Sequence, residues 1–296
     1  MQRVCNIAMG VLGMVAAGLA ASAAAAGPLL VESDWLAQRL SERQVVILHV
    51  GNRAGYDTAH IPGARHITEE DVARPHDMAK GELMLELPDP AALRATLASR
   101  GISDDSVVIV YAGKDTPLQS ATRILFTLDY LGLGAQSSLL NGGLAAWQAA
   151  GHQTTAARPA VTPGRLSARP TSPVVVDAAF VQSLGGRTGY VLVDARAPVF
   201  YAGTEPTFGK RGHIPRAISL PFSNIGDGRG RITIADLKRT FDAAGVKAGD
   251  TVVAYCHVGQ QATAVVLAAR LLDMPVVLYD GAFQDWATRN RGAVAP

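Results

Sequence analysis

The stretch from Thr251 to Thr263 reads TVVAYCHVGQQAT, and it decides the fold assignment. A β-branched, apolar run ends at Cys256, and a short loop with one glycine follows it. From Gln261 to Leu272 the residues are typical of a buried helix. In such an order the loop amides can turn inward toward the thiol, and the helix N-terminus adds partial positive charge beside it.

Two interpretations of Cys256 follow from this layout. Inward amides and a helix N-terminus lower the pKa of a thiol and can hold an anion against the sulfur. They predict a Cys256 thiolate populated below the usual thiol pKa of about 8.5. The alternative is an inert core residue, because free cysteine is often buried. This stretch alone does not separate the two.

Length and composition indicate an ordinary globular protein. The 296 residues suit two domains of common size. Apolar residues make up 48% of the chain and charged residues 18%, which excludes a disordered chain. A net charge of +2 gives no indication of a nucleic-acid or membrane-surface partner.

Residues 1–26 have the pattern of a signal peptide rather than of a fold. Arg3 precedes an apolar run over 7–20, and small residues follow over 21–27. We expect cleavage near Ala26 and an exported protein, with the periplasm as its compartment. The alternative is a permanent membrane anchor, which the many Gly and Ala residues in the run disfavour.

Cleavage would leave one cysteine in the mature chain. Cys5 departs with the leader, so Cys256 has no partner for a disulfide. An unpaired thiol in an oxidising compartment is a liability unless the protein uses or hides it. The cysteine count therefore favours a working Cys256.

An internal duplication spans the rest of the chain. Four blocks occur twice in the same order, about 140 to 153 positions apart. The pairs are a buried strand at 45–50 and 191–196, a His-Ile-Pro-x-Ala motif at 60–64 and 213–217, a strand at 107–111 and 251–255, and a Gly-to-Trp block at 141–147 and 280–286. Strands alternating with helices in each copy predict an α/β fold, a parallel sheet with helices on both faces.

A proline-rich segment divides the two copies. Residues 158–173 hold four prolines without apolar periodicity and form a semi-rigid linker. The predicted domains are residues 28–157 and residues 174–294. Parallel sheets bind ligands beyond the carboxyl ends of their strands, and Cys256 lies at such an end.

The order of these motifs resembles the rhodanese family in its tandem two-domain form. The match rests on His213-Ile214-Pro215-x-Ala217, the Tyr255-Cys256 strand end and the block from Asp280 to Trp286. The resemblance implies two rhodanese-like domains, of which the second is catalytic. Ala112 stands at the position of Cys256 in the first copy, so the first domain is expected to lack a nucleophile.

Sulfurtransferase chemistry is what the resemblance implies. Cys256 would take a sulfane sulfur from a small donor such as thiosulfate and pass it to a thiophilic acceptor, cyanide or a thiol, which can be a protein thiol. No cofactor and no metal are expected, since no cluster has metal-ligand spacing. The amides of residues 257–263 would hold the persulfide or thiolate.

The predicted site has two groups of residues. Cys256 is the catalytic residue, and Asp194 and His213 are structural residues near it. The predicted substrate-binding residues are Arg196 and the loop residues His257, Val258, Gly259, Gln260, Gln261 and Ala262. For Arg196 the alternative is a structural ion pair with Asp194 beneath the loop. A first-domain cation (Arg53, Arg65 or Lys114) is a candidate to reach the loop.

One departure from the family bears on the donor. Thiosulfate and mercaptopyruvate enzymes of this family carry an arginine at the sixth position after the Asp of the Asp-x-Arg motif, and here that position is Phe200. A bidentate anion clamp is therefore missing. Two other functions stay open: a non-enzymatic sulfur carrier or thiol redox sensor, and a phosphatase, which Ala262 disfavours because a Cys-x5-Arg loop needs arginine there.

Overall fold

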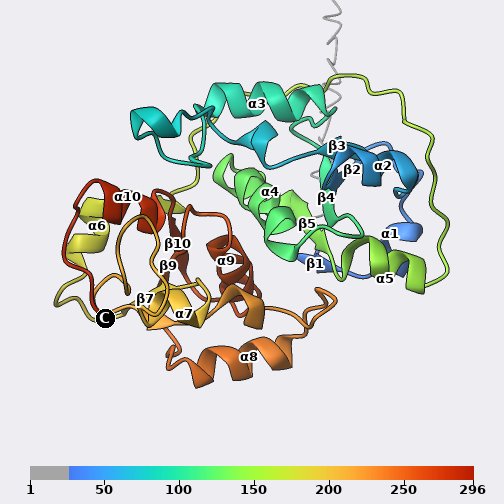
Figure 1. Cartoon of the computed structure of the whole chain (residues 1–296). Coiled ribbons are helices and arrows are strands. Elements are labelled where there is room, and N and C mark those ends of the chain that lie inside the picture. The colour runs from blue at the N-terminus through green and yellow to red at the C-terminus, as the bar shows by residue number, and fades with distance from the viewer. Residues whose placement is uncertain (1–26) are drawn as a thin grey trace, which may run out of the picture.

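The computed structural model describes residues 27–296, so the predicted signal peptide, its cleavage site and Cys5 lie outside the described residues. Two five-stranded parallel sheets with the same strand order make up the two domains, with the orders β1-β5-β4-β2-β3 and β6-β10-β9-β7-β8. Figure 1 shows the domains side by side, each with its own sheet. The predicted α/β fold and its duplication are confirmed.

The first domain begins with a short strand and ends with a helix that precedes the linker in the chain. Its strands are β1 (Leu30–Val31), β2 (Val45–Val50), β3 (Arg65–Ile67), β4 (Val107–Ala112) and β5 (Ser137–Leu140). Its α-helices are α1 (Ser33–Ala37), α2 (Arg53–Thr58), α3 (Pro90–Ser99), α4 (Leu118–Tyr130) and α5 (Gly143–Ala149). Three short 3-10 helices lie at Glu70–Val72, Met78–Lys80 and Gly134–Gln136.

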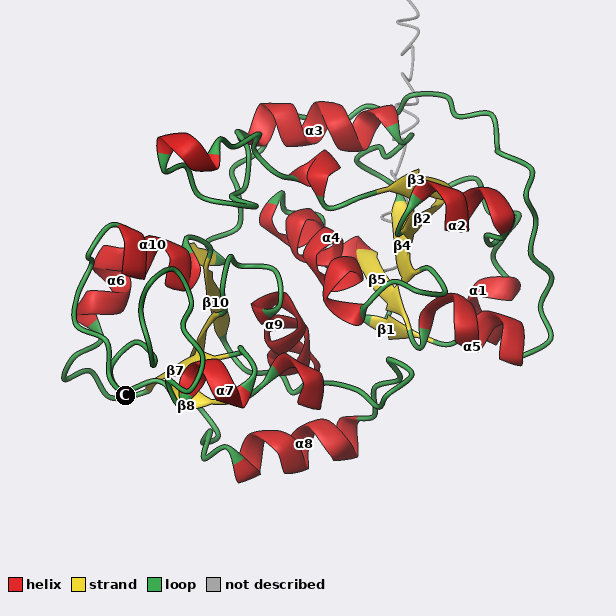
Figure 2. Cartoon of the chain, in the orientation of Figure 1, coloured by secondary structure: helices red, strands yellow, loops and turns green. Residues whose placement is uncertain are grey.

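The second domain repeats this order of elements. Its strands are β6 (Val175–Val176), β7 (Tyr190–Asp194), β8 (Ile218–Ser219), β9 (Thr251–Tyr255) and β10 (Val276–Tyr279). Its α-helices are α6 (Ala178–Ser183), α7 (Pro198–Tyr201), α8 (Ile234–Ala243), α9 (Ala262–Leu271) and α10 (Ala282–Thr288), with a 3-10 helix at Phe222–Asn224. Figure 2 shows helices on both faces of each sheet.

Matching hydrogen bonds confirm the duplication at the level of atoms. The Tyr111 hydroxyl accepts a bond from the amide of Ile61 at 3.0 Å, and the Tyr255 hydroxyl accepts one from Ile214 at 3.0 Å. The two tyrosines lie near the carboxyl ends of equivalent central strands, and the two isoleucines belong to the His-Ile-Pro motifs. The same bond thus fastens the motif to the sheet in both domains.

The two domains share one hydrophobic core. Helices α4 and α9 pack against each other in the middle of the molecule (Figure 1). The largest cluster of buried apolar residues contains side chains from the inner sheet faces of both domains, including Ile124 of α4 and Val265 of α9. Each domain also has a smaller core on its outer sheet face, under α1 and α5 in the first domain and under α6 and α10 in the second. The domains therefore form one packed unit through α4 and α9.

The linker is fastened to the first domain. Residues 158–173 contain no helix or strand. The guanidinium of Arg94 on α3 donates to the carbonyl oxygens of Ser167 and Arg169, and the Asp104 carboxylate accepts from Ser167. These bonds explain how a proline-rich segment keeps a defined path along α3.

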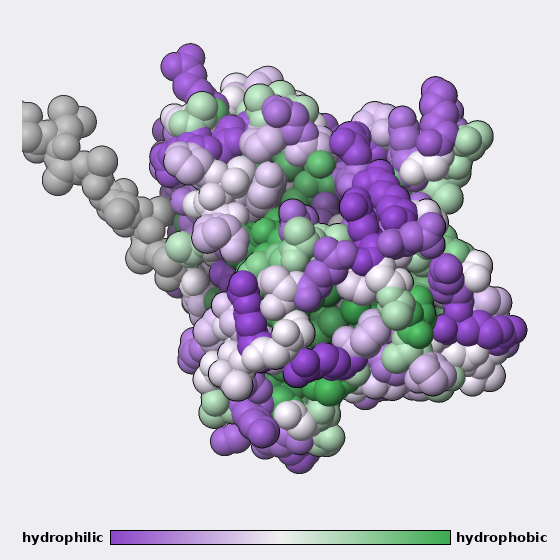
Figure 3. Space-filling view, turned by 90° about the vertical axis from the view of Figure 1, so that its left-hand side faces the viewer, coloured by the Kyte–Doolittle hydropathy of each residue, from purple (hydrophilic) through white to green (hydrophobic). Residues whose placement is uncertain are grey.

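The surface of the molecule is mixed in polarity on the face that Figure 3 shows, with hydrophilic areas and smaller hydrophobic areas between them. The exposed large apolar side chains of the second domain, Tyr190, Val199 and Ile234, come from separate segments. Over residues 27–296 no helix is long and apolar enough to cross a bilayer.

Candidate active site

Cys256 lies at the carboxyl end of the central strand β9, where the loop to α9 begins. Its side chain is fully buried, with 0% of its surface exposed. The loop turns sharply at Gly259, whose φ of +81° is in the left-handed region that glycine tolerates. A β-carbon there would come within 2.7 Å of the Asp280 carbonyl oxygen, so both backbone angle and space require glycine.

Four backbone amides surround the sulfur. The N–H groups of Val258, Gly259, Gln261 and Ala262 donate toward the Cys256 thiol, and each lowers its pKa. Burial acts in the opposite direction and is the largest effect, because a thiolate in the interior loses its hydration. The net result is a raised pKa for Cys256, so the predicted lowering of this pKa is wrong.

The amide ring is smaller than the predicted one. The amide of Thr263 donates to the Gln260 carbonyl at 3.0 Å, and the Thr263 hydroxyl donates to the same oxygen at 2.6 Å. The Gln260 side chain reaches the first domain, with its Nε2 3.5 Å from Ser120 Oγ. Of the residues from 257 to 263, four therefore direct their amides at the sulfur, while Thr263 closes the first turn of the helix.

Arg196 is occupied by a buried ion pair. Its Nη2 lies 2.6 Å from Asp194 Oδ2 and also donates to the Gly212 carbonyl at 2.8 Å. Asp194 in turn accepts a hydrogen bond from the Tyr255 hydroxyl at 2.7 Å. Neither Arg196 nor Asp194 is exposed. The structure therefore favours the structural alternative for Arg196 over contact with substrate.

His213 also has a structural position. Its ring stacks on Tyr201 with centroids 3.9 Å apart, and its Nδ1 lies 3.0 Å from the Tyr201 carbonyl. In the first domain His60 stacks on Tyr56 in the same way, at 4.0 Å. These contacts favour a structural role for His213, while its position near the active site stays a prediction.

His257 and Phe200 form an aromatic pair beside the loop. Their rings meet edge to face with centroids 4.6 Å apart, and both side chains are half-buried. Burial, with a smaller effect of Arg196, lowers the pKa of His257 to about 4. At neutral pH this imidazole is uncharged, so it offers no cation to an anionic donor.

A first-domain arginine reaches the cysteine loop, and it is none of the three proposed. Arg53 pairs with Asp57, and Arg65 donates to the Arg100 carbonyl. Arg123 on α4 lies instead with Nη1 3.2 Å from the Gly259 carbonyl oxygen. The only local sign of Arg123 in the sequence is a cation among the apolar residues of α4, and that sign does not indicate its partner.

The profile of the rhodanese-like domain matches this chain twice, over residues 32–150 and 177–289. The chain belongs to the rhodanese family. Each match contains four of the five strands of one sheet and begins just after the first strand, and the second match contains the amide ring around Cys256. The tandem-domain assignment made from the repeated motifs is confirmed.

Curated rhodanese relatives are similar over nearly their whole length. A Pseudomonas aeruginosa protein named "Probable 3-mercaptopyruvate sulfurtransferase" is 35% identical over 281 residues, covering 90% of this chain and 97% of the relative. A thiosulfate sulfurtransferase of the same organism is 29% identical, covering 88% of this chain and 94% of the relative. This rhodanese is accordingly a sulfurtransferase.

Solved structures show the same fold. The crystal structure of SseA from Escherichia coli, described as a 3-mercaptopyruvate sulfotransferase with the rhodanese fold, superposes with a TM-score of 0.73 at 28% identity. It covers 86% of this chain and 99% of the other. The wild-type structure of EanB matches with a TM-score of 0.77 at 20% identity, covering 90% of this chain and 70% of the other, and shows the fold alone.

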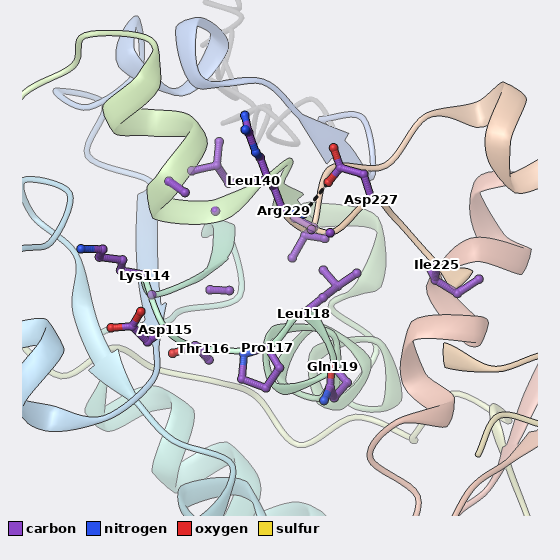
Figure 4. A pocket seen from close by; sticks show the side chains of 18 of the residues that line it. Lys114, Asp115, Thr116, Pro117, Leu118, Gln119, Leu140, Ile225, Asp227 and Arg229 are labelled. Carbon is purple, nitrogen blue, oxygen red and sulfur yellow. Dashed lines mark hydrogen bonds between the residues drawn. The ribbon is translucent and has the colours of Figure 1, made fainter. Parts of the chain in front are cut away.

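The first rhodanese domain keeps the loop without the thiol. Helix α4 begins six residues after Ala112, just as α9 begins six residues after Cys256. Above this loop lies a cavity of about 550 Å³, which the second-domain segment around Asp227 and Arg229 covers (Figure 4). Lys114, the third candidate cation, lines this cavity. The vestigial site is therefore separate from Cys256 and has no nucleophile at the equivalent position.

Among residues 27–296 no group of three or more His, Cys, Asp or Glu side chains is placed to hold a metal ion.

Proposed function

We propose that Cys256 carries the transferred sulfur as a persulfide, and the observation that carries this proposal is the ring of four amides around its sulfur. The Cys256 thiolate attacks the outer sulfur of a donor, and the donor's S–S electron pair leaves with the remainder of the donor. With thiosulfate the leaving group is sulfite. A thiophilic acceptor, cyanide or a thiol, then attacks the terminal sulfur and regenerates the thiolate.

The amide ring suits both anionic states of this cycle. Thiolate and persulfide each carry a negative charge that must be held in a buried site, where charge is costly without hydrogen bonds. Preorganised N–H donors stabilise such a charge without reorganising. Burial raises the pKa of the free thiol because it disfavours a negative charge on the sulfur. The amides act against this effect by stabilising the thiolate and the persulfide formed during turnover.

The donor we propose is less charged than thiosulfate, for instance a low-molecular-weight persulfide. Phe200 offers an apolar ring where related enzymes place an arginine, and His257 is neutral at physiological pH. A dianion leaving water would meet no charge partner from these two residues. A small apolar or singly charged donor has less hydration to lose.

Export completes the proposal. The leader-like residues 1–26 and the single remaining cysteine support a mature protein that works in the periplasm. N-terminal sequencing of protein from a periplasmic fraction tests it, with a mature start close to Gly27 expected. A full-length protein in the cytoplasmic fraction contradicts export.

Steady-state kinetics test the proposed donor and acceptor. Sulfide or thiocyanate release is measured with thiosulfate, 3-mercaptopyruvate and a persulfide as donors and with cyanide or a thiol as acceptor. We expect repeated turnover, with the persulfide giving the highest kcat/KM. Persulfide formation without repeated turnover would instead indicate a carrier.

A further inference from the structure

Arg123 ties the first domain to the cysteine loop of the second. Its side chain is almost completely buried, with 1% exposed. Nη1 donates to the Gly259 carbonyl at 3.2 Å and to Asp280 Oδ1 at 2.7 Å, while Nη2 donates to the Leu85 carbonyl. One guanidinium therefore connects two first-domain segments, through α4 and Leu85, with two second-domain segments that flank the active site.

The carbonyl groups of the cysteine loop must point away from the sulfur, and the contact between Arg123 and Gly259 holds one of them. Amides can face the sulfur only while the neighbouring carbonyls face away from it. The carbonyls of Cys256 and His257 accept from the amides of Phe283 and Gln284, each at 3.0 Å, and the Gln260 carbonyl accepts from Thr263. These three partners belong to the second domain.

The Gly259 carbonyl is different because its partner comes from the first domain. Gly259 has a left-handed backbone, and glycine crosses to other conformations at little cost. The peptide group after Gly259 joins this carbonyl to the Gln260 amide, which is not one of the four ring amides. If that group rotated, the carbonyl oxygen would turn toward the sulfur and repel a thiolate or persulfide. Arg123 is the charged donor that opposes this rotation.

We propose that Arg123 is a positioning residue of the sulfur-transfer reaction, which keeps the Gly259 carbonyl directed away from Cys256 and so keeps a repelling oxygen away from the anion on its sulfur. The inference rests on the proposed role of Cys256 as sulfur carrier. It makes the first domain, which lacks a nucleophile, part of the machinery that binds the anion.

The repeat supports a role beyond packing. The position that corresponds to Arg123 in the second domain is Leu267, a buried apolar residue of α9. An isolated buried ion pair gains little stability over an apolar side chain of similar volume, because both charges lose their hydration. The paired Asp280 is also bound to the first domain, since its Oδ2 accepts from the amide of Leu87 at 2.9 Å.

The test compares Arg123→Met and Arg123→Lys with a matched control, Arg270→Met. Arg270 on α9 pairs with Asp129 on α4 at 3.0 Å, so it spans the same interface without touching the loop. Each full-length variant is measured for kcat and KM with the same donor, for the pH profile of Cys256 alkylation and for thermal stability. The charged groups around the cysteine loop and Arg123 are Arg196, Asp194, Asp280 and Glu69. His257 is neutral above its pKa of about 4.

We expect Arg123→Met to lower kcat roughly tenfold or more with little change in KM, because the lost contact acts on the anion formed in the reaction. The alkylation inflection should move to higher pH by about one unit, which is a tenfold loss of thiolate at neutral pH. Arg123→Lys should recover part of kcat, since one ammonium can reach the carbonyl. Arg270→Met should lose stability while keeping kcat and the inflection.

Unchanged kcat and an unchanged inflection in Arg123→Met would overturn the inference and leave the proposed function intact. Equal kinetic losses in Arg123→Met and Arg270→Met would also overturn it, because they would reduce Arg123 to interface packing. If Arg123→Met does not fold, the double variant Arg123→Met/Asp280→Asn replaces it, because it leaves no buried carboxylate unpaired, and the same loss of kcat is expected there. Retained turnover in Cys256→Ser would be the separate failure of the proposed function.

Discussion

The ring of Phe200 lies edge-on against the imidazole of His257, with centroids 4.6 Å apart. The contact places an apolar side chain beside the first residue of the cysteine loop. Since His257 is neutral above its pKa of about 4, the pair carries no charge under physiological conditions. The donor preference of this enzyme should follow from that absence of charge.

Phe200→Arg is expected to improve thiosulfate binding. A charge-assisted, bidentate contact with an anion contributes on the order of 1.5–3 kcal/mol. The KM for thiosulfate should therefore fall by roughly one to two powers of ten, while the persulfide step on Cys256 persists. Steady-state kinetics across thiosulfate concentrations measure the effect.

Val199→Arg is the matched control for this substitution. Val199 is the preceding residue on α7 and is 43% exposed, so its arginine adds the same charge facing water. An equal fall of KM in both variants would assign the effect to net charge. A wild-type enzyme that already saturates at low thiosulfate would contradict the proposed donor preference.

Gly259→Ala should damage the site more than the fold. A β-carbon at this position meets the Asp280 carbonyl oxygen at 2.7 Å, and the left-handed backbone adds about 1–2 kcal/mol of strain. We expect kcat to drop roughly tenfold or more as the loop amides move off the sulfur. Gly185→Ala, where the nearest atom is 3.8 Å away, should keep wild-type activity. Wild-type kcat in Gly259→Ala would show that the ring does not need this turn.

The first domain should be required although it lacks a nucleophile. A fragment starting near Pro173 loses Arg123, the Thr122–Thr263 hydroxyl contact at 2.7 Å and the apolar partner of α9. It should therefore unfold at lower temperature and show less activity per molecule, measured by thermal unfolding and by turnover at equal concentration. Full activity in the fragment would refute a supporting role for the first domain.

Acid should destabilise the protein through His49. Burial, with smaller effects of His66 and His60, lowers the pKa of His49 to about 4, and its Nδ1 lies 2.9 Å from the Tyr111 hydroxyl. The unfolded chain binds this proton near pH 6.5, so the contribution of His49 is complete above that pH. It falls by about 2 to 3 kcal/mol as the pH drops from 6.5 toward 4.

Denaturant unfolding between pH 7 and pH 4 measures this dependence. His49→Gln removes the titrating group and should flatten the curve, although His257 contributes with the same sign. His76→Gln changes an exposed histidine and should leave the curve as it is in the wild type. If the curve of His49→Gln were as steep as that of the wild type, protonation of His49 would not be the cause of the loss of stability in acid.

The repeated motifs predicted most of the fold, because they report local periodicity and short-range order. Helix α9 begins and ends within one residue of the predicted bounds, Gln261 and Leu272. The position of Cys256 at a strand end also follows from the sequence, since an apolar run and a loop define it without tertiary contacts.

Properties that depend on tertiary packing could not be predicted in the same way. The pKa of Cys256 depends on how completely the domains cover the loop, and that burial outweighs the amides. The contact between Arg123 and Gly259 joins residues 136 positions apart, so no local pattern encodes it. Arg196 was ambiguous for a related reason, because the same Asp-x-Arg spacing serves an exposed clamp or a buried pair.

The most direct test of the account is intact-protein and peptide mass spectrometry after incubation with a sulfur donor. The wild-type protein should gain the mass of one sulfur atom on the peptide that contains Cys256, and cyanide should remove it. Cys256→Ser should show neither the added sulfur nor sulfur transfer, because serine forms no persulfide. Added sulfur on another residue, or turnover retained in Cys256→Ser, would contradict the central claim.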